Sequence, residues 1–300
     1  MTTRVNLETI INSTLFNVQR STSNLSKLQE QISTGKKVNR PSDAPAGARR
    51  ILNIRSEVFR LDQYASNVQT ATQSLNFNSS TLQNTADILV RIQELTMQGI
   101  NSTTDSTGRK VIATEINQLA ESILQDANST RSGRYIFAGT ATKTVPFVAT
   151  RNSSGDISAI TYKGNREKIE YKIGASATVQ VNQTGNEVFV DNKLFSSIIN
   201  IRNDFANGTA TSAQNELNNL DKAHTSVLNS MAKSGGVANT LEITGNRITD
   251  TKLTLNEILA STEDADITEL VLKLKEQENI YQASLASGSV IFNTSILDYL

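Results

Sequence analysis

The two ends of this chain carry the same narrow stripe of apolar residues, in which neighbouring members are alternately four and three positions apart. A repeat of about 3.5 residues is typical of helices that pair in a coiled coil, because so thin a stripe buries only against another helix. The front stripe consists of Leu7, Ile11, Thr14, Val18, Ser21, Leu25, Leu28 and Ile32. The back stripe consists of Ile267, Val271, Leu274, Glu278, Tyr281, Leu285, Gly288, Phe292, Ser295 and Tyr299. We therefore predict that the two terminal helices pair.

Several positions of these stripes are small or polar, which weakens a simple two-helix coiled coil. They are Thr14, Ser21, Glu278, Gly288 and Ser295. We predict that the remaining, apolar members form an assembly seam, which completes its burial against helices of other subunits. An ordinary helix pair within one subunit, with no role in assembly, is the alternative.

Composition favours long helices over a densely packed globule. Hydrophobic residues make up 37% of the 300 residues, aromatic residues 5%, and Trp is absent. The three prolines, Pro41, Pro45 and Pro146, leave long stretches in which nothing interrupts a helix. Basic and acidic residues balance at 29 each, which removes the simplest electrostatic case for nucleic acid or a membrane surface as partner. No apolar run is long enough for a transmembrane helix.

The chain lacks the residue patterns of catalytic, metal and cofactor sites. It has no Cys and a single histidine, His224, which excludes thiolate sites and paired-histidine metal sites. Ser226 lies near His224, but no nucleophile elbow or glycine-rich oxyanion loop surrounds them. The acidic cluster 263–266 is best explained as favourable charge at the start of the last helix. We predict no enzyme activity, no metal and no cofactor.

Start and stop signals divide the helices. Gly35 follows the front stripe at a spacing that suits a left-handed C-cap. Asp43 is the predicted N-cap of the next helix, and Pro45 fits its first turn. Between Gly47 and Gly99 no Gly or Pro occurs, which predicts one long helix.

A second set of signals predicts the rest of the chain. A further helix is expected over 109–130, and helical periodicity resumes near Leu194. Between them, alternating β-branched and aromatic residues separated by glycine-containing turns predict short strands at 160–162, 169–173, 178–181 and 188–190. Asp266 with Glu269 forms a variant of the capping box at the start of the last helix.

These elements predict a mainly α fold with a small β-rich insert, built as an elongated hairpin of long helices with the terminal helices paired as a coiled coil. The predicted terminal coiled-coil domain comprises 1–42 with 262–300. A helical rod domain comprises 43–140 with 194–261 and contains a strand-turn near 134–140. Residues 141–193 form the predicted β-rich outer domain.

The segment 31–45, QISTGKKVNRPSDAP, resembles the turn after the first helix in the bacterial flagellin superfamily. The turn motif consists of Gly35, Asn39, Pro41, Ser42, Asp43 and Pro45. Segments 134–140 and 264–266 also resemble that superfamily, and the ending 295–300 is similar to its hook-filament junction branch. The resemblance covers about 1–145 and 236–300. Ala44 departs from it, since an acidic residue is common there, and so does the opening 1–6.

The resemblance implies a secreted structural subunit of the bacterial flagellum that serves motility. Such a subunit leaves the cell through the flagellar type III export channel and forms a ring between hook-associated protein 1 and the flagellin filament. Its implied partners are further copies of itself, hook-associated protein 1, flagellin and an export chaperone. The lack of a Sec-type apolar block in 1–23 and the absence of Cys agree with such export. The alternatives are a small flagellin, or a secreted adhesin or enzyme with flagellin-like ends and its activity in 140–207.

Overall fold

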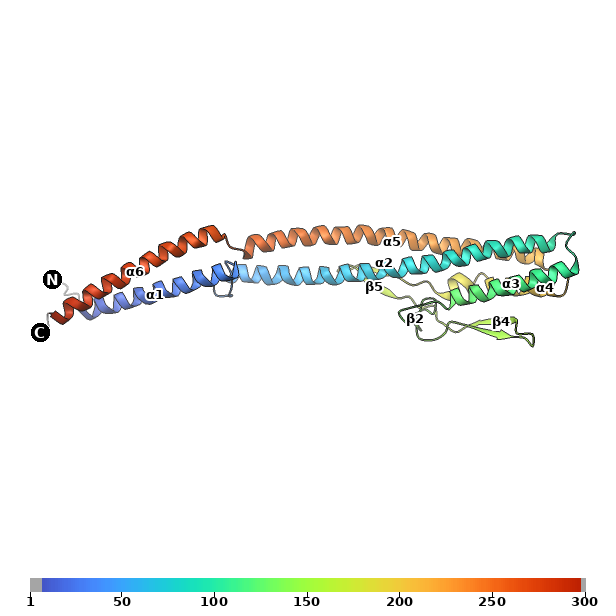
Figure 1. The fold of residues 1–300 in the computed structure, drawn as a ribbon, viewed down its shortest axis with the longest axis horizontal. Coiled ribbons are helices and arrows are strands. Elements are labelled where there is room, and N and C mark those ends of the chain that lie inside the picture. The colour runs from blue at the N-terminus through green and yellow to red at the C-terminus, as the bar shows by residue number, and fades with distance from the viewer. Residues whose placement is uncertain (1–6, 298–300) are drawn as a thin grey trace. The chain divides into compact units, whose positions relative to one another are not determined.

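The computed structural model describes the backbone of residues 7–297 and the side chains of residues 9–290. The helices are α1 (Leu7–Thr34), α2 (Pro45–Ile100), α3 (Ser106–Ala127), α4 (Leu194–Ala206), α5 (Ala213–Glu263) and α6 (Ile267–Leu297). The strands are β1 (Thr130–Arg131), β2 (Arg134–Tyr135), β3 (Phe147–Arg151), β4 (Ile157–Tyr162), β5 (Glu170–Lys172) and β6 (Thr178–Gln180). The order of three helices, a β-rich segment and three further helices confirms the predicted fold class (Figure 1).

The chain divides into two compact units. The terminal unit contains the described residues up to Arg60 and those from Thr251 onward, and the middle unit contains Leu61–Asp250. No helix among the described residues is both long and apolar enough to cross a membrane.

The main core of the middle unit lies between helices and the β-rich segment. Ile112, Ile116 and Ile123 project from one face of α3, as their spacing predicts, and are buried. They belong to the same cluster as Leu82 and Leu89 of α2, and as buried residues of α4 and α5. Phe147 of β3 and Ile157 of β4 are buried in that cluster too. The β-rich segment therefore shares its core with the helices.

The β-rich segment consists of three separate antiparallel hairpins, β1 with β2, β3 with β4 and β5 with β6. Gly133 and Gly155, with φ of 73° and 87°, occupy turn positions that disfavour other residues. The strand predicted at 188–190 is wrong. Asn186–Val190 form a π-helical turn, η1, which directs the adjacent Val188 and Phe189 into the core, where a strand would separate them.

A second, smaller core packs the β5–β6 hairpin onto α2 and α5. Ile173 and Val181 flank the hairpin and lie against Val68 and Leu75 of α2 and Leu241 of α5. Helix α5 runs unbroken through Gly235 and Gly236, although glycine lowers helix propensity. The hairpin is thereby held beside α2, which shapes the pocket considered below.

Candidate assembly surface

Helices α1 and α6 lie side by side within the terminal unit (Figure 1). On α1 the predicted stripe faces inward at every position whose side chain is described. Ser21 is buried, and the other stripe residues are half-buried, namely Ile11, Thr14, Val18, Leu25, Leu28 and Ile32. The pairing of the terminal helices agrees with the prediction from the 3.5-residue repeat.

On α6 the inward side is rotated relative to the predicted stripe. Its least exposed residues include a row again spaced by four and three, namely Leu270, Leu274, Gln277, Tyr281, Ser284 and Gly288, and Glu278 of the predicted stripe is half-buried beside them. Leu274 and Tyr281 of the predicted seam are among them. Ile267, Val271 and Leu285 are 44%, 44% and 46% exposed. Leu7 and Phe292 lie in the helices, but their side chains are outside the described residues, as is Tyr299 altogether.

The seam between the two helices is partly polar. The Nε2 of Gln277 donates a hydrogen bond of 2.8 Å to the Oγ of Ser21. At Gly288 an added Cβ would lie 3.3 Å from the Cγ2 of Thr14, so the helices approach closely there. Small and polar groups at these positions reduce the apolar area that the pair can bury by itself.

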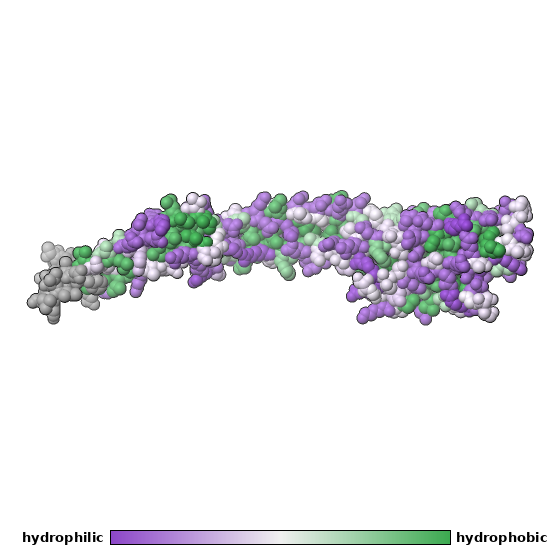
Figure 2. Space-filling model, viewed as in Figure 1, coloured by the Kyte–Doolittle hydropathy of each residue, from purple (hydrophilic) through white to green (hydrophobic). Residues whose placement is uncertain are grey.

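Apolar side chains also occupy other sides of α6. Leu272, Ile280 and Val290 are 72%, 47% and 62% exposed. In Figure 2 hydrophobic residues gather at the surface over the first turns of α6. A helix that is apolar on several sides is one that is buried on several sides. Helix α1 covers one of these sides, and the apolar side chains on the others are exposed in the described part of the subunit.

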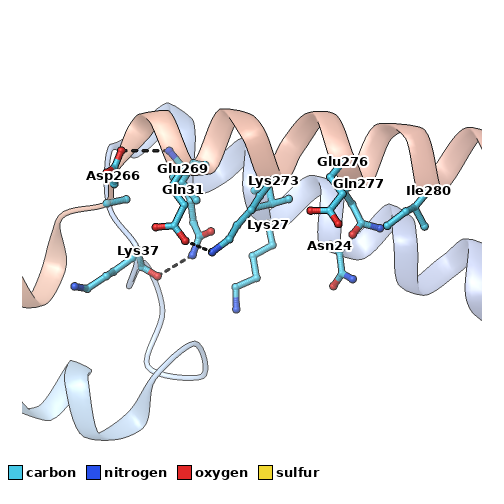
Figure 3. Close-up of a pocket in the computed structure, with 13 residues that line it drawn as sticks. Asn24, Lys27, Gln31, Lys37, Asp266, Glu269, Lys273, Glu276, Gln277 and Ile280 are labelled. Carbon is cyan, nitrogen blue, oxygen red and sulfur yellow. Dashed lines mark hydrogen bonds and ion pairs between the residues drawn. The ribbon is translucent and has the colours of Figure 1, made fainter.

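A groove of about 580 Å³ runs along the start of α6 where it lies against α1 (Figure 3). Several charged side chains of the groove contact other groups of the terminal unit. The Nζ of Lys273 lies 2.6 Å from Glu269, and the Nζ of Lys37 donates to the carbonyl of Ser261 at 2.6 Å. Asp266 Oδ1 accepts from the backbone N–H of Thr268 and Glu269, which confirms it as the N-cap of α6.

The turn between α1 and α2 is built around one carboxylate. Gly35 ends α1 with φ of 69°, as its predicted capping role requires. Asp43 Oδ2 accepts from the backbone N–H of Asn39 at 3.2 Å and of Arg40 at 2.9 Å, and Oδ1 lies 3.0 Å from Lys27 Nζ. The bond from Lys27, followed by these backbone bonds, lowers the pKa of Asp43 below its usual value.

The prediction of Asp43 as the N-cap of α2 is wrong, because its carboxylate binds residues that precede it. Pro45 is the first residue of α2, as predicted. Pro41 and Ser42 are exposed at the tip of the turn. The carboxylate of Asp43 therefore stabilises the turn that follows α1 and does not cap the first turn of α2.

Glu263, at the end of α5, is a buried carboxylate that pairs with two basic residues of the terminal unit. The sequence did not predict this role. The carboxylate of Glu263 pairs with Lys36 and accepts from Arg55 at 2.5 Å. Its carbonyl accepts from the backbone N–H of Lys37 at 2.8 Å, and Gly35 accepts from Ala265 at 2.9 Å. Burial raises the pKa of Glu263, but the bonds from Lys36 and Arg55 outweigh burial and hold that pKa below its usual value.

The acidic cluster 263–266 thus has structural roles at both of its ends. Within the described residues, no group of three or more His, Cys, Asp or Glu side chains could hold a metal ion. Nothing in the local sequence indicates the partners of Glu263, because Lys36 and Arg55 come from the opposite end of the chain.

We expect Glu263→Gln to lower the free energy of unfolding of the terminal unit by about 1 to 3 kcal/mol at pH 7, because two cations lose their buried counter-charge. Since the folded pKa of Glu263 lies below the usual 4.5, its stabilisation is present above that pH and is lost as the pH falls through the lowered pKa. The variant should therefore lose less stability on acidification than the unaltered chain. Thermal unfolding followed by circular dichroism at several pH values measures both effects.

Glu257→Gln is the matched control, because Glu257 is exposed on the same helix. A loss of stability equal to that of the control, or an unchanged response to acid, would contradict the role given to Glu263.

Comparison with known proteins supports a flagellar class. Residues 5–142 match the model of the bacterial flagellin N-terminal helical region. Flagellar hook-associated protein 3 of Escherichia coli K12 is 32% identical over 164 residues, which are 54% of this chain and 49% of that protein. Flagellin of Bacillus subtilis strain 168 is 25% identical over 301 aligned positions, which cover 94% of each chain. The flagellar junction protein of Legionella pneumophila has a TM-score of 0.58 at 18% identity, over 73% of this chain and 99% of that one.

The matched N-terminal region and these relatives make the chain similar to flagellar proteins of the bacterial flagellin superfamily. Within that class, the resemblance to flagellar hook-associated protein 3 is confirmed. The chain spans about half the length of the hook-associated relatives that it matches, at 49% and 56%.

Proposed function

We propose that this protein is the subunit of the junction ring between hook-associated protein 1 and the flagellin filament. The observation that carries the proposal is the apolar surface of α6 that α1 leaves uncovered, with Val271, Leu272 and Leu285 as its members. An exposed apolar surface on a helix that already has one partner favours assembly with further helices. The names of the hook-associated and junction relatives support the hook-filament junction as the proposed place of that assembly.

Ring formation requires each subunit to offer different faces to its neighbours. Contacts of this heterologous kind close into a ring when the rotation between subunits closes. In this proposal α6 lies inside the assembly, and α1 covers it from one side. The assembly seam of the sequence prediction then has two parts, one that joins α1 to α6 and one, with Ile267, Val271 and Leu285, that joins neighbouring copies.

The same proposal includes secretion through the flagellar type III channel with the aid of an export chaperone, and a final location at the hook-filament junction. A chain without Cys forms no disulfide that would have to be broken before it is threaded through a channel. The partners proposed are copies of the chain itself, hook-associated protein 1 and flagellin.

A small flagellin is the second candidate, and one observation favours it. The Bacillus subtilis flagellin matches 94% of both chains, whereas the match to the hook-associated protein of Escherichia coli covers 49% of that relative. A flagellin presents surfaces that allow unlimited growth, whereas a junction protein stops after a limited layer.

Mixing experiments distinguish these two functions. Purified protein is added to isolated hooks capped with hook-associated protein 1 and, in parallel, to short flagellin seeds, and the products are imaged by electron microscopy. The junction function predicts a layer on the hooks that stops growing as protein is added, and no extension of the seeds. Filaments that lengthen with protein concentration would overturn the junction assignment in favour of flagellin. Hooks that bind no protein would overturn it as well.

A further inference from the structure

A cavity of about 320 Å³ lies in the middle unit, between α2 and two hairpins of the β-rich segment. Arg131, Arg134 and Tyr135 line it from the β1–β2 hairpin, Tyr171 from β5, and Ser74 and Asn78 from α2. This volume falls in the range of pockets that hold small ligands, which starts at about 300 Å³. The labels β2 and β5 in Figure 1 mark the two hairpins.

The pocket lining carries positive charge that no carboxylate of the lining offsets. Two arginines line it, and no carboxylate does. All other arginines of the middle unit have partners: Arg91, Arg151, Arg166 and Arg202 pair with carboxylates, Arg109 binds backbone carbonyls, and Arg247 is also engaged. Within the described chain, the guanidinium groups of Arg131 and Arg134 have neither a hydrogen bond nor an ion pair. The same holds for the hydroxyl groups of Tyr135 and Tyr171.

The hairpin itself holds the two positive charges together. Arg131 and Arg134 are directly paired in its register, and Ser132 and Gly133 form the turn between them with φ of 52° and 73°. Directly opposed side chains project from the same side of a hairpin, and like charges in such a pair are destabilising. A bound anion would relieve that repulsion and would give both guanidinium groups a partner.

Tyr135 and Tyr171 of the pocket lining restrict the class of ligand that the site fits. A planar guanidinium fork matches the geometry of a carboxylate or a phosphate. Tyr135 and Tyr171 are half-buried residues of the pocket lining, and a tyrosine combines an apolar ring with a polar hydroxyl. The geometry points to a binding site for an acidic monosaccharide, whose carboxylate or phosphate lies between Arg131 and Arg134 and whose ring contacts the tyrosines. This site is independent of the proposed assembly surface, since all of its residues belong to the middle unit.

Calorimetric titration of the full-length chain at low salt tests this site. The probes are glucuronate, which carries a carboxylate, and glucose 6-phosphate, which carries a phosphate, with glucose and inorganic phosphate beside them. We expect saturable binding of at least one of the two acids and weaker binding of glucose and phosphate. The double variant Arg131→Gln with Arg134→Gln should lower the affinity by about tenfold or more, because both charge-assisted contacts are lost.

Arg166→Gln serves as the matched control, since Arg166 lies in the same unit and pairs with Asp191 at 2.8 Å outside the pocket. Its affinity for the acids should equal that of the unaltered chain. The double variant should also melt no lower than the unaltered chain, because the opposed charges are gone, which excludes unfolding as the cause of lost binding.

Each contrary result overturns the inference. No saturable binding of either acid would remove the site. Undiminished affinity in the double variant would place binding elsewhere. Inorganic phosphate that binds as tightly as glucose 6-phosphate, with no binding of glucuronate, would refute recognition of the sugar ring.

Discussion

Replacing Leu285 with asparagine should abolish attachment of the protein to the hook end while leaving the thermal unfolding of the free subunit unchanged. Leu285 is 46% exposed in the free subunit, on a part of α6 that α1 covers incompletely. In the proposed ring this part is buried against a neighbouring copy, where an amide without partners costs about 1 to 3 kcal/mol. The penalty recurs in every subunit, so one substitution should remove the layer. Electron microscopy of hooks and swimming of a complemented strain measure the loss.

Leu274→Asn is the matched comparison, because Leu274 is a leucine of the same helix that faces α1. This variant should weaken the α1–α6 pair in the free subunit, so that helix content or amide protection falls before any assembly. Lys275→Gln, at an exposed position of α6, should alter neither property. Normal attachment by Leu285→Asn would show that this part of α6 is not an assembly surface, and contacts would have to be sought on the other helices.

The front helix could be predicted residue by residue, whereas the back helix could not. The stripe of α1, although Thr14 and Ser21 interrupt it, is the row along which apolar side chains recur at spacings of four and three, so its inward side follows from spacing alone. On α6, Leu270 and Val271 both continue a spacing of three and four toward Leu274, and apolar residues such as Leu272 and Ile280 lie on other sides. Packing in three dimensions, and not periodicity, selects Leu270.

Contacts between distant parts of the chain explain the other differences. Asp43 has the residue type and position of an N-cap, but Lys27 and two preceding N–H groups compete for its carboxylate. Glu263 lies in an acidic cluster whose simplest interpretation is favourable charge at the start of a helix. Its partners Lys36 and Arg55 are far away in sequence. The pattern of Val188, Phe189 and Val190 fits a strand, and the aromatic core overrides that local preference.

Phe189 tests whether the β-rich segment and the helices form one cooperative structure. Its side chain is 1% exposed, and its ring centre lies 5.2 Å from that of Phe137, 5.3 Å from that of Phe147 and 5.8 Å from that of Phe195. Phe195 belongs to α4 and Phe147 to β3, so Phe189 joins a helix to a hairpin. Aromatic pairs of this geometry add to the free energy of burial.

Phe189→Ala should therefore lower the free energy of unfolding of the middle unit by about 3 to 5 kcal/mol. The substitution leaves a cavity that the neighbouring aromatic side chains fill only in part. Urea unfolding followed by circular dichroism measures the change, and the signal from the helices should move with it, because helices and hairpins share this core. Val190→Ala, at a 40% exposed position of the same turn, should change stability by less than about 0.5 kcal/mol. If Phe189→Ala left the helical transition in place, residues 141–193 would form a separate domain, as their composition predicts.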